Sequence, residues 1–122
     1  MKKVQIINGP NLNMLGKREP EIYGYLTLDE INAKLVERSE LLDLELFFFQ
    51  SNHEGAIADK VHEDFNENFD GIIINPGALT HTSVVLRDAL AMMSCPMVEI
   101  HLSNVYKREA FRHKSMLADI VT

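Results

Sequence analysis

Four short apolar runs alternate with longer amphipathic segments along the 122 residues of this chain. The apolar runs cover residues 4–7, 44–49, 71–74 and 97–100, and the amphipathic segments cover residues 28–42, 54–65 and 84–93. Runs with so few polar residues are typical of parallel strands that are covered on both faces, and the segments between them have the spacing of helices. Because strand–helix–strand connections are right-handed, this order predicts a parallel sheet with helices on its faces.

Capping signals and apolar stripes locate the first two helices. Thr27 with Glu30 has the pattern of a capping box, and Ser51 with Glu54 repeats it. The apolar stripes are Leu28, Ile31, Leu35 and Leu42 in the first helix and Ile57, Val61 and Phe65 in the second. We therefore predict an α/β fold of the flavodoxin-like type, a three-layer sandwich with a parallel sheet, in a single domain over residues 1–122. Residues 117–122 look like the beginning of a fifth strand, so either the sheet closes with four strands or the end of the chain has been lost.

Composition restricts the partners and the location of the protein. A net charge of −6 with basic residues mixed among acidic ones argues against nucleic acid as a partner, although a small anion needs only a local positive site. No apolar stretch approaches the roughly 20 residues that cross a bilayer, and the basic start leads into a strand without a cleavage site. We therefore expect a cytoplasmic protein that does not bind membranes. Cys95 is the one cysteine, and its place before Pro96 predicts a small buried side chain.

Three polar clusters follow directly on three of the predicted strands, at residues 8–13, 75–83 and 99–104. The carboxyl ends of parallel strands meet at one edge of a wound sheet, where ligands bind. The sequence therefore predicts that these clusters converge on one active-site crevice.

The connection between the first strand and the first helix is about 18 residues long, against about 2 to 6 in most α/β units, which predicts a lid or a binding loop. Within it, Arg18 stands five residues before Tyr23. A tyrosine serves as a base at neutral pH only where cations stabilise its phenolate, and Arg18 is a candidate for that role. Pro20 stiffens the run between them and Gly24 permits a tight loop. The alternative is ordinary surface packing of an arginine and a tyrosine.

His81 and His101 lie just beyond two strands, and Glu99 stands two residues before His101. Residues two apart on a strand share a face, so the Glu99 carboxylate can orient or charge the imidazole and make His101 a general acid. Each histidine taken alone is more often structural. The same three residues also suit zinc or manganese, so a metal-dependent hydrolase is an alternative, although no HExxH pattern or acidic cluster accompanies them.

Other polar groups at the strand ends suit a small ligand. Asn75 precedes Pro-Gly, where its amide can bind hydroxyls or a carboxylate, or form an Asx turn. Backbone amides near Leu102 and Ser103, with the guanidinium of Arg112, predict an anion site. Two neighbouring basic residues compete for the cationic role: Arg108 and Lys107.

Five polar motifs lie between residues 4 and 113. They read Asn-Gly-Pro-Asn-Leu-Asn at 8–13, Gly-Lys-Arg-Glu-Pro at 16–20 with Tyr-Gly at 23–24, Gln-Ser-Asn-His-Glu-Gly at 50–55, Asn-Pro-Gly-Ala at 75–78 with Thr-His-Thr-Ser at 80–83, and Glu-Ile-His-Leu-Ser-Asn at 99–104 with Phe-Arg-His at 111–113. Together they resemble the motifs of the type II 3-dehydroquinate dehydratases. The resemblance implies a flavodoxin-like subunit that converts 3-dehydroquinate to 3-dehydroshikimate in the shikimate or quinate pathway, by anti elimination of water through an enolate. It also implies a homododecamer, a tetramer of trimers, that uses neither metal nor organic cofactor.

The resemblance further implies a role for each site residue. It makes Tyr23 the proton-abstracting base, Arg18 the stabiliser of the transition state and His101 the acid. Glu99 would support His101, and Asn11 would hold the enolate and its water. The implied substrate contacts are Asn75, His81, the backbone of Leu102 and Ser103, and Arg112. Spacing alone leaves Asp88 as either a surface or an interface charge, whereas the resemblance places it in the site of a neighbouring subunit.

The chain departs from the family pattern at two places. Tyr25 stands where the family usually has a small polar residue, which puts a second phenol in the loop. The family's final strand and terminal helix are absent, which exposes a sheet edge or part of the assembly surface. Because the catalytic positions precede this gap, we expect the chemistry to remain possible, and a binding or scaffold protein with the same site is the alternative. Flavin or nucleotide binding is disfavoured because the first loop lacks a GxGxxG run.

Overall fold

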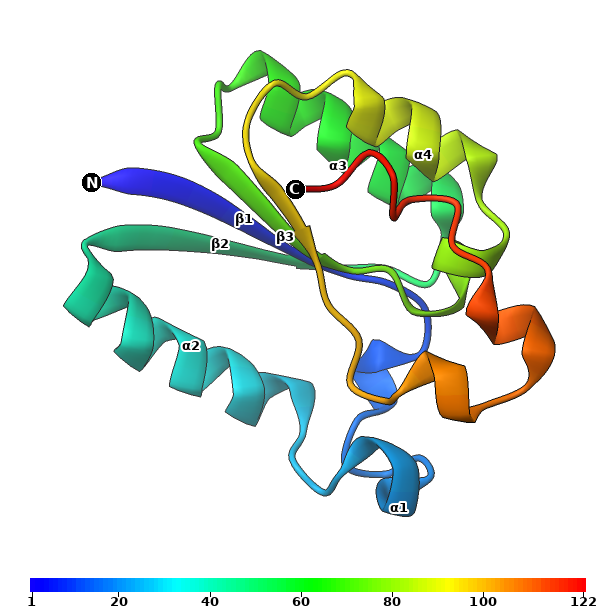
Figure 1. The fold of residues 1–122 in the computed structure, drawn as a ribbon. Coiled ribbons are helices and arrows are strands. Elements are labelled where there is room, and N and C mark those ends of the chain that lie inside the picture. The colour runs from blue at the N-terminus through cyan, green and yellow to red at the C-terminus, as the bar shows by residue number, and fades with distance from the viewer.

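A computed structural model describes residues 1–122, and its centre is a parallel sheet of four strands (Figure 1). The strands are β1 (Lys2–Asn8), β2 (Leu44–Gln50), β3 (Gly71–Asn75) and β4 (Met97–Glu99). Their order across the sheet is β2-β1-β3-β4, and every adjacent pair is parallel. The predicted parallel sheet is confirmed. From β1 the chain adds β2 on one side of the sheet and then β3 and β4 on the other, so the strand order changes direction between β1 and β3. Wound parallel sheets bind ligands at the carboxyl ends of the strands at such a point.

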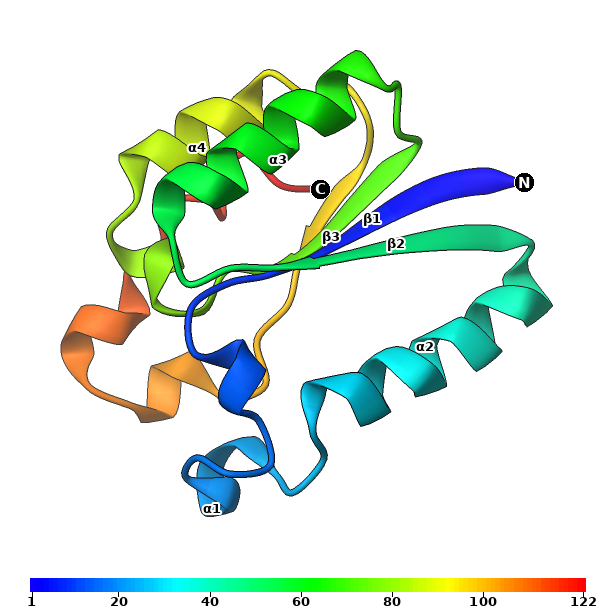
Figure 2. The same cartoon turned by 180° about the vertical axis from the view of Figure 1, so that it is seen from behind.

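Helices cover both faces of the sheet and give three layers (Figures 1 and 2). α2 (Leu28–Leu42) lies on one face, whereas α3 (Glu54–Asn66) and α4 (Val84–Ala91) lie together on the other. The main core lies between the sheet and the α3–α4 pair, and its buried residues are Ile7, Ile57, Ala58, Val61, Ile72, Ile74, Leu86, Ala89, Leu90, Met97 and Leu117. Full burial of a large aliphatic side chain contributes about 1.5–3 kcal/mol, so this layer supplies most of the apolar stabilisation. The predicted three-layer α/β fold is confirmed.

The start of α2 follows the predicted capping box. Thr27 Oγ1 accepts the N–H of Glu30 at 3.2 Å, and the Glu30 carboxylate accepts the N–H of Thr27 at 3.2 Å. Together these bonds use one free N–H of the first helical turn and the N–H of the capping residue. The predicted stripe holds only in part, because Leu42 at the end of the helix is 59% exposed.

Two predictions for α3 are wrong. Ser51 is not its cap: the helix begins at Glu54 after His53, and the Ser51 hydroxyl instead accepts the N–H of His53 at 3.0 Å in the turn that follows β2. Phe65 does not continue the apolar stripe, since it is 45% exposed whereas Asp64 is fully buried. The next buried residue of α3 after Val61 comes three positions later rather than four. It is Asp64, so the buried face of the helix contains a carboxylate.

Short helices shape the loops at the carboxyl ends of the strands. The long connection between β1 and α2 contains η1 (Leu12–Met14) and α1 (Pro20–Tyr23). η2 (Gly77–His81) follows β3, and η3 (Val105–Lys107) and η4 (Ala110–His113) follow β4. The polar clusters are thus held in turns of defined geometry at one edge of the sheet.

The segment after η4 contains no strand. It returns along the α3–α4 side of the sheet, where Leu117 is fully buried in the core. At its end, the N–H of Thr122 donates to the carbonyl of Met97 at 2.6 Å, and the N–H of Met97 donates to Thr122 Oγ1 at 2.9 Å. Thr122 therefore lies beside the edge of β4, but the predicted beginning of a fifth strand is an irregular segment.

Cys95 packs half-buried against the core, as its position predicts, and burial raises the pKa of its thiol. None of the helices combines the length and the apolar character needed to span a membrane.

Candidate active site

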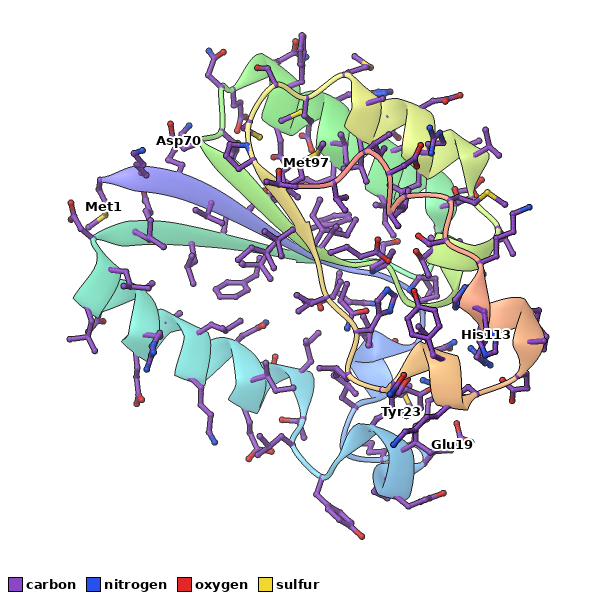
Figure 3. All side chains as sticks on the ribbon, in the orientation of Figure 1. Met1, Glu19, Tyr23, Asp70, Met97 and His113 are labelled. Carbon is purple, nitrogen blue, oxygen red and sulfur yellow. The ribbon has the colours of Figure 1, made fainter.

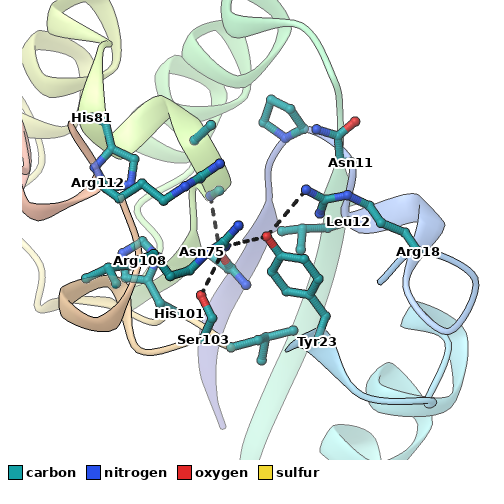
Figure 4. A pocket seen from close by; sticks show the side chains of 15 residues that line it. Asn11, Leu12, Arg18, Tyr23, Asn75, His81, His101, Ser103, Arg108 and Arg112 are labelled. Carbon is teal, nitrogen blue, oxygen red and sulfur yellow. Dashed lines mark hydrogen bonds between the residues drawn. The ribbon is translucent and has the colours of Figure 1, made fainter. Parts of the chain in front are cut away.

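The carboxyl ends of β1, β3 and β4 border one pocket, at the end of the molecule that carries Tyr23 and His113 and away from Met1 (Figure 3). Its volume is about 140 Å³. Nine predicted site residues line it: Asn11, Arg18, Tyr23, Asn75, His81, His101, Leu102, Ser103 and Arg112 (Figure 4). The predicted convergence of the polar clusters is therefore confirmed.

Two glycines allow the loops after β1 and β3 to approach each other closely. A Cβ on Gly9 would lie 2.5 Å from the carbonyl oxygen of Pro76, so a side chain there requires the backbone to move. Gly77 has a φ of +59°, and a Cβ there would lie 3.1 Å from the carbonyl oxygen of Pro10. The N–H of Gly9 also donates to the carbonyl of Asn75 at 2.8 Å. This contact brings the two loops into one pocket.

The two asparagines of the pocket are held in different ways. Asn11 adopts a left-handed φ of 71°, and its N–H donates to Asn52 Oδ1 at 2.9 Å. Asn75 Oδ1 accepts the N–H of Gly77 at 3.2 Å, which is the Asx turn considered above as an alternative to ligand binding. Because the Asx turn occupies only Oδ1, the Nδ2 donor of Asn75, a lining residue, is left for a ligand.

The phenol oxygen of Tyr23 receives hydrogen bonds from two guanidinium groups (Figure 4). Nη1 of Arg108 donates at 2.6 Å, and Nη2 of Arg18 donates at 3.4 Å. The Arg18 guanidinium also lies over the tyrosine ring, with Cζ 4.4 Å from its centroid. Two adjacent cations stabilise negative charge on this oxygen.

Arg108 is the site residue whose contact with Tyr23 the sequence did not indicate. It was expected only as a competitor for an anion, whereas the hydrogen bond to Tyr23 is its shortest contact and raises the pKa of its guanidinium. The two residues are 85 positions apart in the sequence, so no local sequence pattern indicates that their side chains meet. Lys107, the other competitor, does not line the pocket.

The pocket carries a local positive charge in a chain whose net charge is −6. Three guanidinium groups and two imidazoles line it, and no carboxylate does. The backbone N–H groups of Leu102 and Ser103 make no hydrogen bond within the chain. Arg112 donates through Nε to Glu109, which leaves its other nitrogens for a ligand. These donors suit a small carboxylate, as predicted for Leu102, Ser103 and Arg112.

Glu99 and His101 form the predicted pair. Nε2 of His101 lies 2.5 Å from Oε2 of Glu99, and the two side chains are only 23% and 9% exposed, respectively. Burial acts to raise the pKa of Glu99, but hydrogen bonds from His101 and Thr80 outweigh it and hold the pKa below its usual value. Glu99 is therefore ionised and accepts the hydrogen bond from His101.

His81 presents one ring nitrogen to the pocket. Its Nδ1 lies 2.7 Å from the carbonyl oxygen of Lys114. A carbonyl oxygen only accepts, so Nδ1 carries the hydrogen, and Nε2 of the neutral ring is the acceptor left for a ligand hydroxyl.

Two predicted site residues do not line the pocket. Glu99 instead contacts His101, which does line the pocket. Asp88 is exposed on α4 and touches none of the lining residues through a hydrogen bond or ion pair. Its predicted contribution to the site of a neighbouring subunit stays a prediction.

The ligand set of the metal-dependent alternative is not assembled. No group of three or more His, Cys, Asp or Glu side chains is arranged to hold a metal ion. Glu99 contacts His101, whereas His81 is bound to the Lys114 carbonyl.

Known proteins that are similar to this chain are described as dehydroquinases or 3-dehydroquinate dehydratases. The model of the family described as dehydroquinase class II matches residues 2–122. The 3-dehydroquinate dehydratase of Roseiflexus castenholzii is 58% identical over 120 residues, which is 98% of this chain and 76% of the relative. That of Endomicrobium trichonymphae is 57% identical over 118 residues, which is 97% of this chain and 82% of the relative. The crystal structure of type II dehydroquinase from Butyrivibrio crossotus superposes with a TM-score of 0.97 at 46% identity, covering 99% of this chain and 84% of that one.

Proposed function

The chain belongs to the class II dehydroquinase family and is a 3-dehydroquinate dehydratase, and we propose that its reaction takes place between Tyr23 and His101. The reaction is the anti elimination of water from 3-dehydroquinate through an enolate, which gives 3-dehydroshikimate. One observation carries the proposal: the tyrosine oxygen held by two guanidinium groups lines the same pocket as a carboxylate-paired histidine.

Tyr23 is the base in this proposal. Its phenolate takes a proton from the carbon next to the ketone, and the electron pair of the broken C–H bond forms the enolate. Arg18 and Arg108 stabilise the phenolate before the transfer through the bonds they donate to its oxygen. Asn11, at the rim of the same pocket, holds the enolate oxygen and its water.

His101 is the acid. The enolate re-forms the ketone as the C–O bond to the leaving hydroxyl breaks, and the imidazolium gives that hydroxyl a proton so that water departs. The ionised carboxylate of Glu99 orients His101 for this step through its contact with Nε2. A base and an acid in one pocket thus serve the two halves of the elimination.

The substrate carboxylate and hydroxyls orient the ring between these groups. The free N–H groups of Leu102 and Ser103, together with Arg112, bind the carboxylate. Asn75 and His81 bind the hydroxyls through Nδ2 and Nε2.

We also propose that the protein is a cytoplasmic homododecamer, a tetramer of trimers, in which Asp88 completes the site of a neighbouring subunit. Asp88 is exposed on α4, where Val84 and Val85 are 54% and 52% exposed. Neighbouring exposed valines and a carboxylate on one helix are suited to a subunit contact. Light scattering that gives the mass of twelve chains is the expected result, and a monomer mass would contradict it.

The test of the base is Tyr23→Phe, which keeps the ring and removes the phenol oxygen. Absorbance of the conjugated enone product follows turnover continuously. We expect kcat to fall by about 10²–10⁴-fold, the contribution of a general base, with substrate binding largely retained. Tyr25→Phe is the matched control, because Tyr25 lies in the same loop, is 79% exposed and does not line the pocket.

Near-normal turnover of Tyr23→Phe would remove Tyr23 from this role. If the unchanged protein binds dehydroquinate in a calorimeter without any rise in enone absorbance, it is a binding protein and the proposed function is wrong.

The test of the acid is His101→Ala, compared with His62→Ala at an exposed position of α3. We expect the first to lower the rate of water loss by about 10²–10⁴-fold and the second to leave it unchanged. An unchanged rate in His101→Ala would count against the acid.

A further inference from the structure

Thr80 presents a hydroxyl to the Glu99–His101 pair from outside the substrate pocket. It lies in η2, one residue before His81, and is 1% exposed. Its Oγ1 is 2.6 Å from Oε2 of Glu99 and 3.0 Å from Oγ of Ser115. Thr80 does not line the pocket, so any influence on the reaction passes through Glu99.

The hydrogens of this cluster have one arrangement. An ionised carboxylate only accepts, so Thr80 donates its single hydroxyl hydrogen to Glu99. The contact between Thr80 and Ser115 then requires Ser115 to donate. The Ser115 oxygen in turn accepts the N–H groups of Leu117 and Ala118, at 3.1 and 3.0 Å. Every donor therefore points toward Glu99.

The same carboxylate oxygen contacts the histidine. Oε2 of Glu99 accepts from Thr80 and lies 2.5 Å from Nε2 of His101, so the threonine bond fixes the oxygen that the imidazole must meet. Nε2 carries a hydrogen in both charge states of the ring. Nδ1 is then the nitrogen that gains and loses the proton used in the reaction.

The backbone around Thr80 and Ser115 is fixed as well. The N–H of Met116 donates to the carbonyl of Thr80 at 2.6 Å, and Nη1 of Arg87 donates to the carbonyl of Met116 at 2.8 Å. Arg87 also forms an ion pair with Asp119. The segment directly after Ser115 is thus tied to η2 and to α4.

We propose that Thr80 and Ser115 are positioning residues that hold the Glu99 carboxylate in place and thereby keep His101 in the form with hydrogen on Nε2. This inference rests on the proposed function of His101 as the acid. Hydrogen bonds behind a functional side chain fix its orientation, and at metal sites their removal typically costs about 10–100-fold in activity.

The other titratable groups around Glu99 are few. The cavity that Glu99 and Thr80 line is also lined by His81, His101, Arg112 and His113, together with Tyr106. None of them donates to the Glu99 oxygen that Thr80 occupies except His101. None of these titratable groups therefore replaces the threonine hydroxyl at that position when it is removed.

The direct test is nitrogen NMR of the His101 ring in the folded protein, with the signal assigned by its loss in His101→Gln. In the unchanged protein, the neutral ring is expected to show hydrogen on Nε2 alone. Thr80→Val keeps the shape and removes the donor, and we expect a mixture of the two neutral forms. Thr80→Ser keeps the hydroxyl and should restore the single form.

Kinetics provide the second readout. Thr80→Val should lower kcat by about tenfold with KM within about twofold. Thr80→Ser should return both values toward those of the unchanged enzyme. Equal losses in both variants would show that packing of the threonine methyl, rather than its hydroxyl, is responsible, and the inference would be wrong.

If Thr80→Val does not fold, Ser115→Ala carries the same NMR test, and an unchanged single form would overturn the inference. Hydrogen on Nδ1 of the unchanged protein would overturn it as well. These results concern the ring and not turnover, so they separate this inference from the proposed function, whose failure is the absence of enone formation by the unchanged enzyme.

Discussion

Asp64 is a carboxylate on the buried face of α3 that has no hydrogen-bond partner for its side chain. Its side chain is fully buried, and neither oxygen has a hydrogen-bond partner. Burial raises the pKa of this group from 3.8 to about 6, with Glu67 and Glu63 adding to the rise and Lys60 opposing it. The folded chain therefore holds a proton on Asp64 more tightly than the unfolded chain does.

The consequence for stability has a definite sign. Between about pH 4 and pH 6 the folded state binds more protons than the unfolded state, so stability falls as the pH rises through this window. Above it, the loss is complete and constant. Each tenfold change in proton affinity is worth about 1.4 kcal/mol, so the change from 3.8 to about 6 corresponds to about 3 kcal/mol at pH 7.

Asp64→Asn removes this loss, because an amide of nearly the same size does not ionise. We expect the variant to match the unchanged protein in its free energy of unfolding near pH 4, and to exceed it by about 2–3 kcal/mol at pH 7. Urea unfolding followed by circular dichroism at pH 4, 5, 6 and 7, at one protein concentration, measures the difference. Other carboxylates cancel in this difference because both proteins contain them.

Asp59→Asn on the exposed side of the same helix is the matched control and should show no such trend. A difference between Asp64→Asn and the unchanged protein that is the same at pH 4 and pH 7 would refute the argument that burial without a partner raises this pKa. Destabilisation by Asp64→Asn at pH 7 would refute it equally.

The remaining predictions concern a helix cap and a charged contact. Thr27→Ala removes the side-chain acceptor at the start of α2 and should lower the free energy of unfolding by about 1 kcal/mol in urea, whereas Thr27→Ser should leave it near its original value; equal stability of all three proteins would contradict the capping role. Arg108→Ala leaves Arg18 as the one donor to the Tyr23 oxygen and should lower kcat by about 10²–10³-fold in the enone assay. Arg108→Lys should recover part of this loss, whereas an unchanged kcat in Arg108→Ala would show that Arg18 suffices.

The elements that follow from local physics were predicted well. The continuous apolar runs became the four parallel strands, and Thr27 with Glu30 formed the reciprocal cap. The cap depends on residues a few positions apart, and the strands are recognised by the run of apolar residues that burial requires. The alternation of elements then restricts the topology, because the hand of each crossover is fixed.

The two wrong predictions for α3 arose where two local solutions compete. Ser51 can cap a helix or close the turn after β2, and its hydroxyl bonds the N–H of His53 in that turn. Asp64 and Phe65 lie three and four residues beyond Val61, and both spacings keep a helix face inward. The packing of α3 against the sheet and α4 buries Asp64, and no rule about hydrophobicity predicts that choice.

By itself, the sequence determined the parallel α/β architecture, the edge of the sheet at which the site lies and most of the residues that line it, because strand periodicity and the common direction of the strands are properties of the chain read in order. Only the tertiary structure decided which groups far apart in the sequence meet there. Arg108 reaches Tyr23 across 85 positions, and Thr80 reaches both Glu99 and Ser115 across 19 and 35. Such contacts depend on distances of a few ångströms between side chains on different loops. These distances are fixed by tertiary packing, and the spacing of residues along the chain does not predict them.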